Sequence, residues 1–138
     1  MFKKIVVPLD LAHVERLQKA LHVAAGLARE HGASICYIGV TTATPGPIAR
    51  TPEEFSAKLE AFAKAQGLEQ GVKTEAHMLV SHDPAVQMDR ELEAAVTALG
   101  ADLVVMASHV PNVTDYVWSG HGAHLAAHSA ASVMLIRA

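Results

Sequence analysis

Short apolar runs alternate with longer segments of helical period along this chain, and this alternation constrains the fold more than any other feature. The run Asp102–Ala107 is apolar on both faces, as expected for a central strand of a parallel sheet. Other strands are predicted from β-branched or alternating sequence at Phe2–Leu9, Ser34–Val40, Val72–Val80 and Ser132–Arg137. Because strands alternate with helices, we expect an α/β fold with an open parallel sheet and helices on both faces.

Four helices are expected between these strands. The first carries apolar residues at helical spacing and precedes Gly32, which suits a C-terminal cap. The segment from Thr51 to Glu54 has the form of a capping box with proline at the first helical position. The predicted helices are Ala12–His31, Thr51 to about Gly67, Asp83-Pro84 to near Leu99-Gly100, and about Gly120 to Ala130.

Length and composition indicate a single domain over residues 1–138. With 51% hydrophobic residues, the chain is able to bury a core of its own. The net charge is −3 and no basic stripe is present, which argues against a nucleic-acid partner. The opening MFKKIVVPLD is too short for a signal peptide or membrane span, and the lone Cys36 cannot form an internal disulfide. We therefore expect a cytoplasmic protein with no membrane partner.

In sheets of this kind ligands bind beyond the carboxyl ends of the strands, at a switch in strand order. The residues expected there are Pro8-Leu9-Asp10, Val40-Thr41 and the segment from Ala107 onward. The common phosphate-binding motifs are absent, since the sequence has neither GxGxxG after the first strand nor GxxxxGK[ST]. The segment DLAHVERL after the first strand lacks glycine and serine, so its backbone is poorly suited to wrapping a pyrophosphate.

The ordered motifs IVVPLD, HDPAVQM, GADLVVMASH, SGHGAHLAAHSA and SVMLIR run from one end of the chain to the other. In this order they resemble the universal stress protein family over essentially the whole chain. The resemblance implies a Rossmann-like domain of the adenine nucleotide alpha hydrolase-like type, with five parallel strands in the order 3-2-1-4-5. It also implies a role in stress survival and a homodimer formed through the last strand, 132–137.

Part of that family binds ATP through a loop of pattern G-x2-G-x9-G-[ST]. On this chain the four positions fall on Ala107, Val110, Gly120 and His121, so that only one of them matches. The resemblance implies that Asp10 contacts the nucleoside and that Val40 offers backbone groups to the adenine. The candidate ligand contacts are Pro8, Leu9, Asp10, Val40, Ala107, His109, Val110, Gly120, His121, Gly122 and Ala123.

The loop departs from phosphate-binding chemistry mainly in its first half. Val110 is β-branched and precedes Pro111, so it is restricted to extended conformations. If a bound loop needs positive φ there, the strain is about 1–3 kcal/mol. The sequence from Gly120 to Gly122 still opens a helix, whose N-terminus attracts anions, and protonated His109 and His121 would add charge. Binding of a smaller anion, or of a nucleotide with fewer phosphates, therefore remains an alternative.

Several residues have both a structural and a functional interpretation. Asp10 either contacts a ligand or caps the following helix. His121, His124 and His128 share one helix face, and we expect a polar surface there with Ala123, Ala126, Ala127 and Ala130 packed inward. Zinc binding and pH sensing are the alternatives for these histidines. Tyr116 and Trp118 either pack within the dimer or form a surface for a protein partner.

Three functions remain after this reading. The first is a dimeric regulatory module that binds ATP weakly or not at all because its loop is degraded. The second is a regulator that binds ATP, ADP or AMP, with magnesium, between the first and fourth strands. A metal-dependent or histidine-based hydrolase ranks far below both. We therefore assign no metal site and no catalytic residue, and expect no enzyme activity beyond slow nucleotide hydrolysis.

Changing Ala107 and Val110 to glycine and His121 to serine restores the motif, and should create or strengthen ATP binding. Relief of the strain at Val110 corresponds to roughly a ten- to hundredfold gain in affinity. Calorimetric titration of wild type and triple variant with ATP measures this gain. If affinity does not rise, the obstacle to ATP lies elsewhere in the cleft.

Overall fold

The computed structural model describes residues 1–42, 44–81, 84–108 and 121–137. Its single sheet has five parallel strands in the order β3-β2-β1-β4-β5. The elements are β1 (Lys4–Leu9), η1 (Leu11–Arg16), α1 (Gln18–His31), β2 (Ser34–Thr41), α2 (Pro52–Gln70), β3 (Thr74–Val80), α3 (Pro84–Ala98), β4 (Leu103–Ser108), α4 (His121–His128) and β5 (Ser132–Arg137). Both the fold class and the strand order are confirmed.

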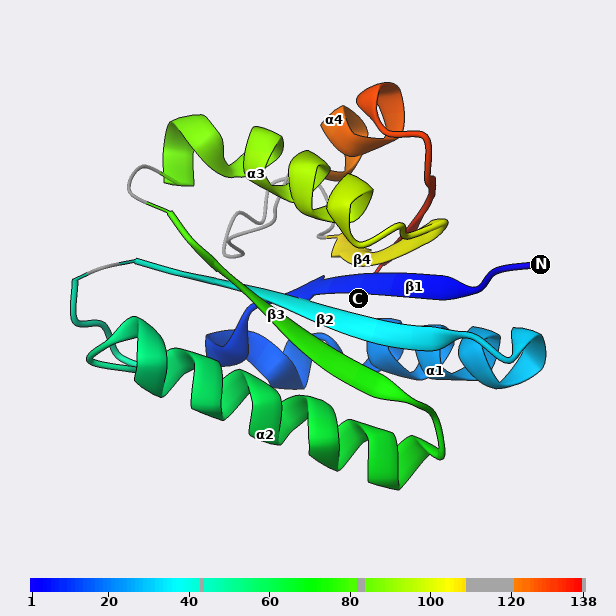
Figure 1. Cartoon of the computed structure of the whole chain (residues 1–138), viewed down its shortest axis with the longest axis horizontal. Coiled ribbons are helices and arrows are strands. Elements are labelled where there is room, and N and C mark those ends of the chain that lie inside the picture. Colours follow the sequence, from blue (N-terminus) through cyan, green and yellow to red (C-terminus); the bar gives the residue numbers. More distant parts are fainter. Residues whose placement is uncertain (43, 82–83, 109–120, 138) are drawn as a thin grey trace.

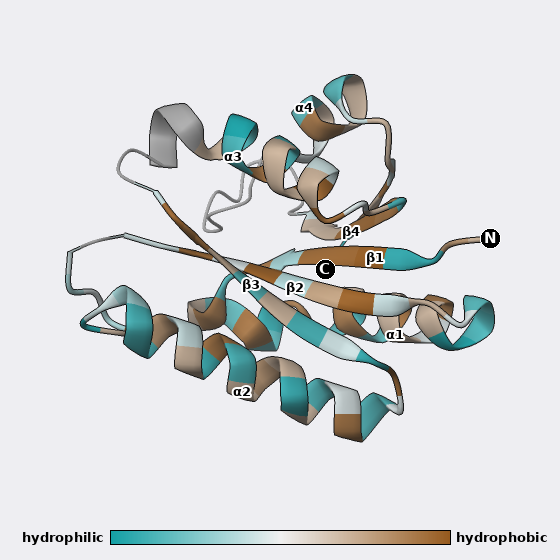
Figure 2. Cartoon of the chain, in the orientation of Figure 1, coloured by the Kyte–Doolittle hydropathy of each residue, from teal (hydrophilic) through white to brown (hydrophobic). Residues whose placement is uncertain are grey.

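Helices cover both faces of the sheet. Figure 1 shows α1 and α2 on one side and α3 and α4 on the other. Two apolar cores result. One holds Ile5 and Val7 with α1 and α2, and the other holds Val6 with α3 and α4. Figure 2 shows the corresponding pattern, with the central strands apolar and much of the outer surface of α2 hydrophilic. No helix among the described residues is long and apolar enough to span a membrane.

The predicted first helix, Ala12–His31, is wrong over its first turn and a half. The chain instead forms the 3-10 helix η1, is non-helical at His13 (φ −132°, ψ 35°), and enters α1 at Gln18. The Asp10 side chain accepts the Ala12 N–H at 2.9 Å, and the Asp10 carbonyl accepts the His13 N–H at 3.0 Å. These short-range bonds compete with the i to i−4 ladder of an α-helix.

The predicted ends of two other helices also change. α2 continues past Gly67 and ends at Gln70, and its C-cap is Gly71, which has φ 67° and donates its N–H to the Gly67 carbonyl. Gly67 allows close packing instead, because a Cβ there would lie 2.6 Å from Thr74 Oγ1 of β3. α4 ends at His128, short of the predicted Ala130.

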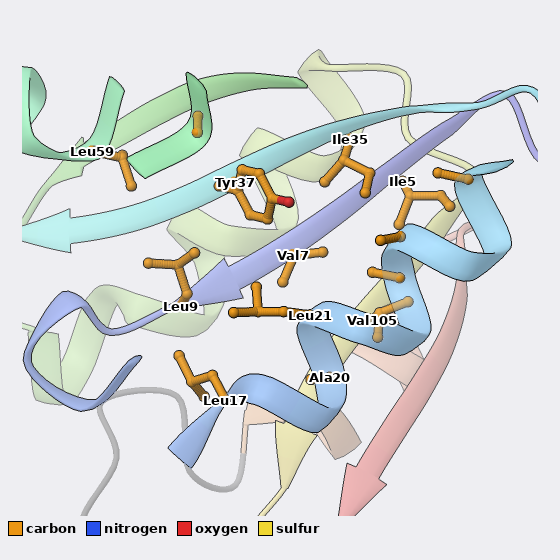
Figure 3. Close-up of a cluster of buried hydrophobic side chains, with 14 of the residues drawn as sticks. Ile5, Val7, Leu9, Leu17, Ala20, Leu21, Ile35, Tyr37, Leu59 and Val105 are labelled. Carbon is orange, nitrogen blue, oxygen red and sulfur yellow. The ribbon is translucent and has the colours of Figure 1, made fainter. Parts of the chain in front are cut away.

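Tyr37 of β2 lies fully buried in the core that α1 and α2 cover. Figure 3 shows it beside Leu59 of α2, with Val7 and Leu21 nearby. Its ring meets Phe62 edge to face, with centroids 5.3 Å apart. Among the described residues its hydroxyl has no hydrogen-bond partner. Burial raises the pKa of Tyr37 to about 12.

Tyr37→Phe should therefore raise the free energy of unfolding at neutral pH by about 1 kcal/mol, because it removes an unpartnered buried hydroxyl and keeps the ring. Since the pKa of Tyr37 is raised on folding, wild type should also lose stability relative to the variant as pH rises above 10 toward 12. Urea unfolding at pH 7 and at alkaline pH measures both effects. Destabilisation of the variant at pH 7 would show that the hydroxyl has a partner.

Candidate functional site

The carboxyl edge of the sheet contains the switch in strand order, between β1 and β4. β1 pairs with β2 along its whole length, from Lys4 to Leu9. Its paired register with β4 covers only Ile5 and Val6. β1 and β4 are therefore paired near their amino ends, and this pairing stops before their carboxyl ends. This is the point at which α/β sheets of this type bind ligands.

Asp10 follows β1 directly at this edge. Its side chain is 14% exposed, and Oδ1 accepts the Ala12 N–H at 2.9 Å. Oδ2 lies 2.8 Å from Nδ1 of His13, whose side chain is 32% exposed. The capping interpretation of Asp10 is therefore confirmed. Capping leaves the ligand-contact interpretation open, because a carboxylate has about four lone-pair sites.

His13 is a further residue at this edge, although its position in the sequence predicts a place within a regular helix. The signal was an aspartate that ends a strand and a histidine three residues later. With Asp10 as a cap, the turn that follows carries the imidazole back to the carboxylate. His13 is thus the only imidazole that the described residues show in contact with Asp10.

The remaining predicted contacts fall at three places along this edge. Pro8 and Leu9 are buried at the end of β1, and Val40 is partly buried at the end of β2. Ala107 is partly buried near the end of β4. Beside Val40, Ser81 is fully buried and donates its backbone N–H to the Thr41 carbonyl at 2.9 Å. The Ser81 hydroxyl, another group that we missed, has no partner among the described residues.

The loop itself lies mostly outside the described residues, as do His109, Val110, Gly120, Tyr116 and Trp118. At its far end, His121 is the first residue of α4, Gly122 is buried and Ala123 is exposed. A Cβ at Gly122 would clash with the Leu135 side chain of β5. A side chain at Gly122 would therefore require the Leu135 side chain to move, whether or not a phosphate binds at this end of α4.

The predicted orientation of α4 is wrong. The four alanines expected to pack inward, Ala123, Ala126, Ala127 and Ala130, are exposed, whereas Gly122 and Leu125 are buried. In the observed orientation Leu125 packs in the core with Met88 and Leu92 of α3. His124 also lies against α3, with Nδ1 3.8 Å from Asp89 Oδ2 and Nε2 3.5 Å from Glu93 Oε2.

The described residues were considered for a metal site, at the histidines of α4, and for a reactive thiol, at Cys36. The His124 and His128 rings lie side by side, with centroids 4.4 Å apart. No group of three or more His, Cys, Asp or Glu side chains among the described residues is placed to hold a metal ion. The side chain of His121 is not among them, so the three-histidine site stays untested. Burial, aided by Glu75, raises the pKa of the Cys36 thiol to about 11, which keeps it protonated.

Two hollows lined by described residues lie away from this edge. One, of about 520 Å³, lies between α2 and β3. The other, of about 580 Å³, adjoins the amino ends of β1, β2 and β3 and contains Lys3, Arg29 and Lys73. Arg29 there donates to the carbonyl of Gln70, the last residue of α2, at 2.8 Å. Its charge thus stabilises a helix C-terminus, an ordinary structural role.

The geometry defines a doubly wound α/β domain whose candidate ligand site lies at the switch between β1 and β4. Residues 1–137 match the model of the universal stress protein family. The chain therefore belongs to this family.

Known proteins of similar sequence and structure carry the same name. Universal stress protein G of Escherichia coli O157:H7 is 24% identical over 148 residues, covering 99% of this chain and all of that protein. A universal stress protein from Archaeoglobus fulgidus in complex with dAMP has a TM-score of 0.65 at 19% identity, covering 97% of both chains. One from Arabidopsis thaliana with AMP bound has a TM-score of 0.68 at 16% identity, covering 98% of this chain and 91% of that one.

Proposed function

We propose that this protein is a homodimeric regulatory module of the stress response, whose site at the carboxyl edge takes an adenine nucleotide with few phosphates and binds ATP weakly. The observation that carries the proposal is the contrast between the two sides of the switch point. On the β1 side, Asp10 is held by hydrogen bonds at the strand end. On the β4 side, Ala107 and Val110 stand where the phosphate loop has glycine, and Pro111 follows Val110.

The chemistry of the two sides supports a nucleoside monophosphate. In this proposal the Asp10 carboxylate accepts from ribose hydroxyls or an amino group, and the backbone at Val40, at the end of β2, contacts the base. A triphosphate needs several backbone N–H donors from a glycine-rich loop, and Pro111 has no N–H to give. The relatives with dAMP and AMP support a ligand of this size.

We assign regulation to this module and no enzyme activity beyond slow hydrolysis. Magnesium chiefly assists the transfer or binding of di- and triphosphates, so the preferred ligand needs it least. A cytoplasmic location stays a prediction. The competing function, a module that binds no nucleotide and acts through a protein partner at Tyr116 and Trp118, also stays a prediction. Nucleotide binding separates the two.

Calorimetric titration of the purified dimer with AMP, ADP and ATP, with and without magnesium, tests the proposal. We expect AMP to bind at least about tenfold more tightly than ATP, because strain at Val110 opposes the arrangement that a triphosphate needs. GMP serves as the control for base selection. If ATP binds more tightly than AMP, or no adenine nucleotide binds at all, the proposed ligand is wrong.

The homodimer is proposed to form through β5. Among the described strands it stands at the end of the sheet and pairs only with β4. Val133, Met134 and Ile136 are partly exposed, and Leu135 is 46% exposed. Open strand edges with apolar side chains are sites of association. α4 leads into β5, and the exposed Ala123, Ala126 and Ala127 of α4, with Ala130 in the connection, add small apolar side chains to this part of the surface.

Leu135→Lys should weaken the dimer by about a hundredfold or more, since a charge is then buried at the edge pairing. Leu68→Lys is the matched control, because Leu68 is 80% exposed on α2, on the other side of the molecule. Sedimentation velocity over a range of concentrations measures both variants. A dimer unaffected by Leu135→Lys would place the interface elsewhere.

A further inference from the structure

Two buried hydroxyls among the described residues have no hydrogen-bond partner, those of Tyr37 and Ser81. Tyr37 lies in the middle of β2, in the core that α1 and α2 cover. Ser81 directly follows β3 at the carboxyl edge of the sheet and has no exposed surface. Buried polar groups are nearly always hydrogen-bonded, so each exception needs an explanation. The position of Ser81 at the edge that carries the candidate site provides one.

The hydrogen bonds of the sheet determine the face on which Ser81 lies. Its backbone N–H donates to the Thr41 carbonyl at 2.9 Å, which continues the ladder between β2 and β3 one residue past Val80. Ser81 therefore keeps the alternation of β3, and its side chain lies on the same face as that of Leu79. Leu79 is paired with Val40, and both pack against the core that α3 and α4 cover. The Ser81 hydroxyl thus lies on this face, beside the end of β2.

The strand order places Ser81 at one end of the candidate site. Asp10 comes directly after the pair that Leu9 of β1 forms with Gly39 of β2, and Val40 comes directly after the same pair on β2. β3 stands on the other side of β2 from β1, and β4 stands on the other side of β1. Two strand spacings, about 10 Å, separate β1 from β3. Along the edge, the groups therefore follow in the order β4, Asp10, Val40 and Ser81.

A nucleotide laid along this edge has its parts in the same order as the strands. With the ribose at Asp10 and the phosphate toward β4, the base extends over the end of β2 toward β3. The hydroxyl of Ser81 is able both to donate and to accept a hydrogen bond. A purine base offers acceptors at its ring nitrogens, and adenine offers a donor at its amino group. The base therefore carries groups that match the unpartnered hydroxyl.

We infer that Ser81 is a base-binding residue of this site, and that its hydroxyl forms a hydrogen bond with the base of the bound nucleotide. Because Ser81 has no exposed surface, the base has to displace the atoms that cover it, and the contact forms only on binding. The hydroxyl then gains a hydrogen bond that the free protein does not give it, which favours the bound state. This inference rests on the proposed function and adds a contact to the base.

The test combines calorimetric titration with AMP and adenosine and urea unfolding of the ligand-free protein, on wild type, Ser81→Ala and Tyr37→Phe. Tyr37→Phe is the matched control, because it removes the other unpartnered buried hydroxyl at a position in the middle of β2. Each substitution removes a hydroxyl and keeps the rest of the side chain. The two variants therefore differ in whether the lost hydroxyl lies at the carboxyl edge.

Ser81→Ala should lower the affinity for AMP and for adenosine by the same factor, about tenfold, the effect of one buried hydrogen bond to the ligand. The urea midpoint of ligand-free Ser81→Ala should rise, because the variant no longer buries an unpartnered hydroxyl. Tyr37→Phe should also gain stability, but should keep the wild-type affinity for both ligands. A serine that only supported the fold would instead lose stability and affinity together on substitution.

The failures of the two proposals are distinguishable. If Ser81→Ala binds AMP with the wild-type affinity, the inference about Ser81 is wrong and the proposed function stands. If AMP loses affinity and adenosine does not, the effect lies at the phosphate and the base contact is wrong. A lower urea midpoint for Ser81→Ala would show that the hydroxyl already has a partner in the free protein, which also overturns the inference. If neither AMP nor adenosine binds wild type, the proposed function fails and takes this inference with it.

Discussion

Burial of both faces of the central strands is the constraint on which the rest of the structure depends. Successive residues of β1 point to opposite cores, Ile5 and Val7 toward α1 and α2, and Val6 toward α3 and α4. Neither face is able to meet water, so helices have to cover both. Parallel strands then require crossover connections, which bring the chain segments after β1 and β4 to the same edge of the sheet. The candidate site is a consequence of this topology.

The strands were predictable because hydrophobic periodicity reports burial directly, whereas their order came from the family resemblance. The wrong predictions fall where contacts between residues far apart in the sequence determine the structure. Gly67 was read as a helix end, but its role is to let Thr74 approach. In the observed orientation of α4, Leu125 and His124 meet residues of α3 that are more than thirty positions away in the sequence. Local spacing does not contain that information.

The candidate site was predictable at Asp10 and at the ends of β1 and β2, because parallel topology alone places them together. His13 was missed because its spacing fits a helix as well as a turn, and the capping bonds of Asp10 decide between the two. Gly122 carries a similar lesson. Its glycine looked like a remnant of a phosphate loop, whereas Leu135 occupies the space that a side chain would need. In both cases a contact that local spacing does not report explains the residue: the Asp10 carboxylate for His13 and the Leu135 side chain for Gly122.

The central claim is that the β1 side of the candidate site keeps its ligand contacts and that the site binds a mononucleotide. Amide chemical-shift mapping of ¹⁵N-labelled protein during an AMP titration tests it most directly. The account predicts saturable shifts at Leu9 to His13, at Val40 and Thr41, and at the start of α4, with little change around the hollow between α2 and β3. Absence of shifts at the β1 and β2 ends, or shifts confined to α2 and β3, would contradict it.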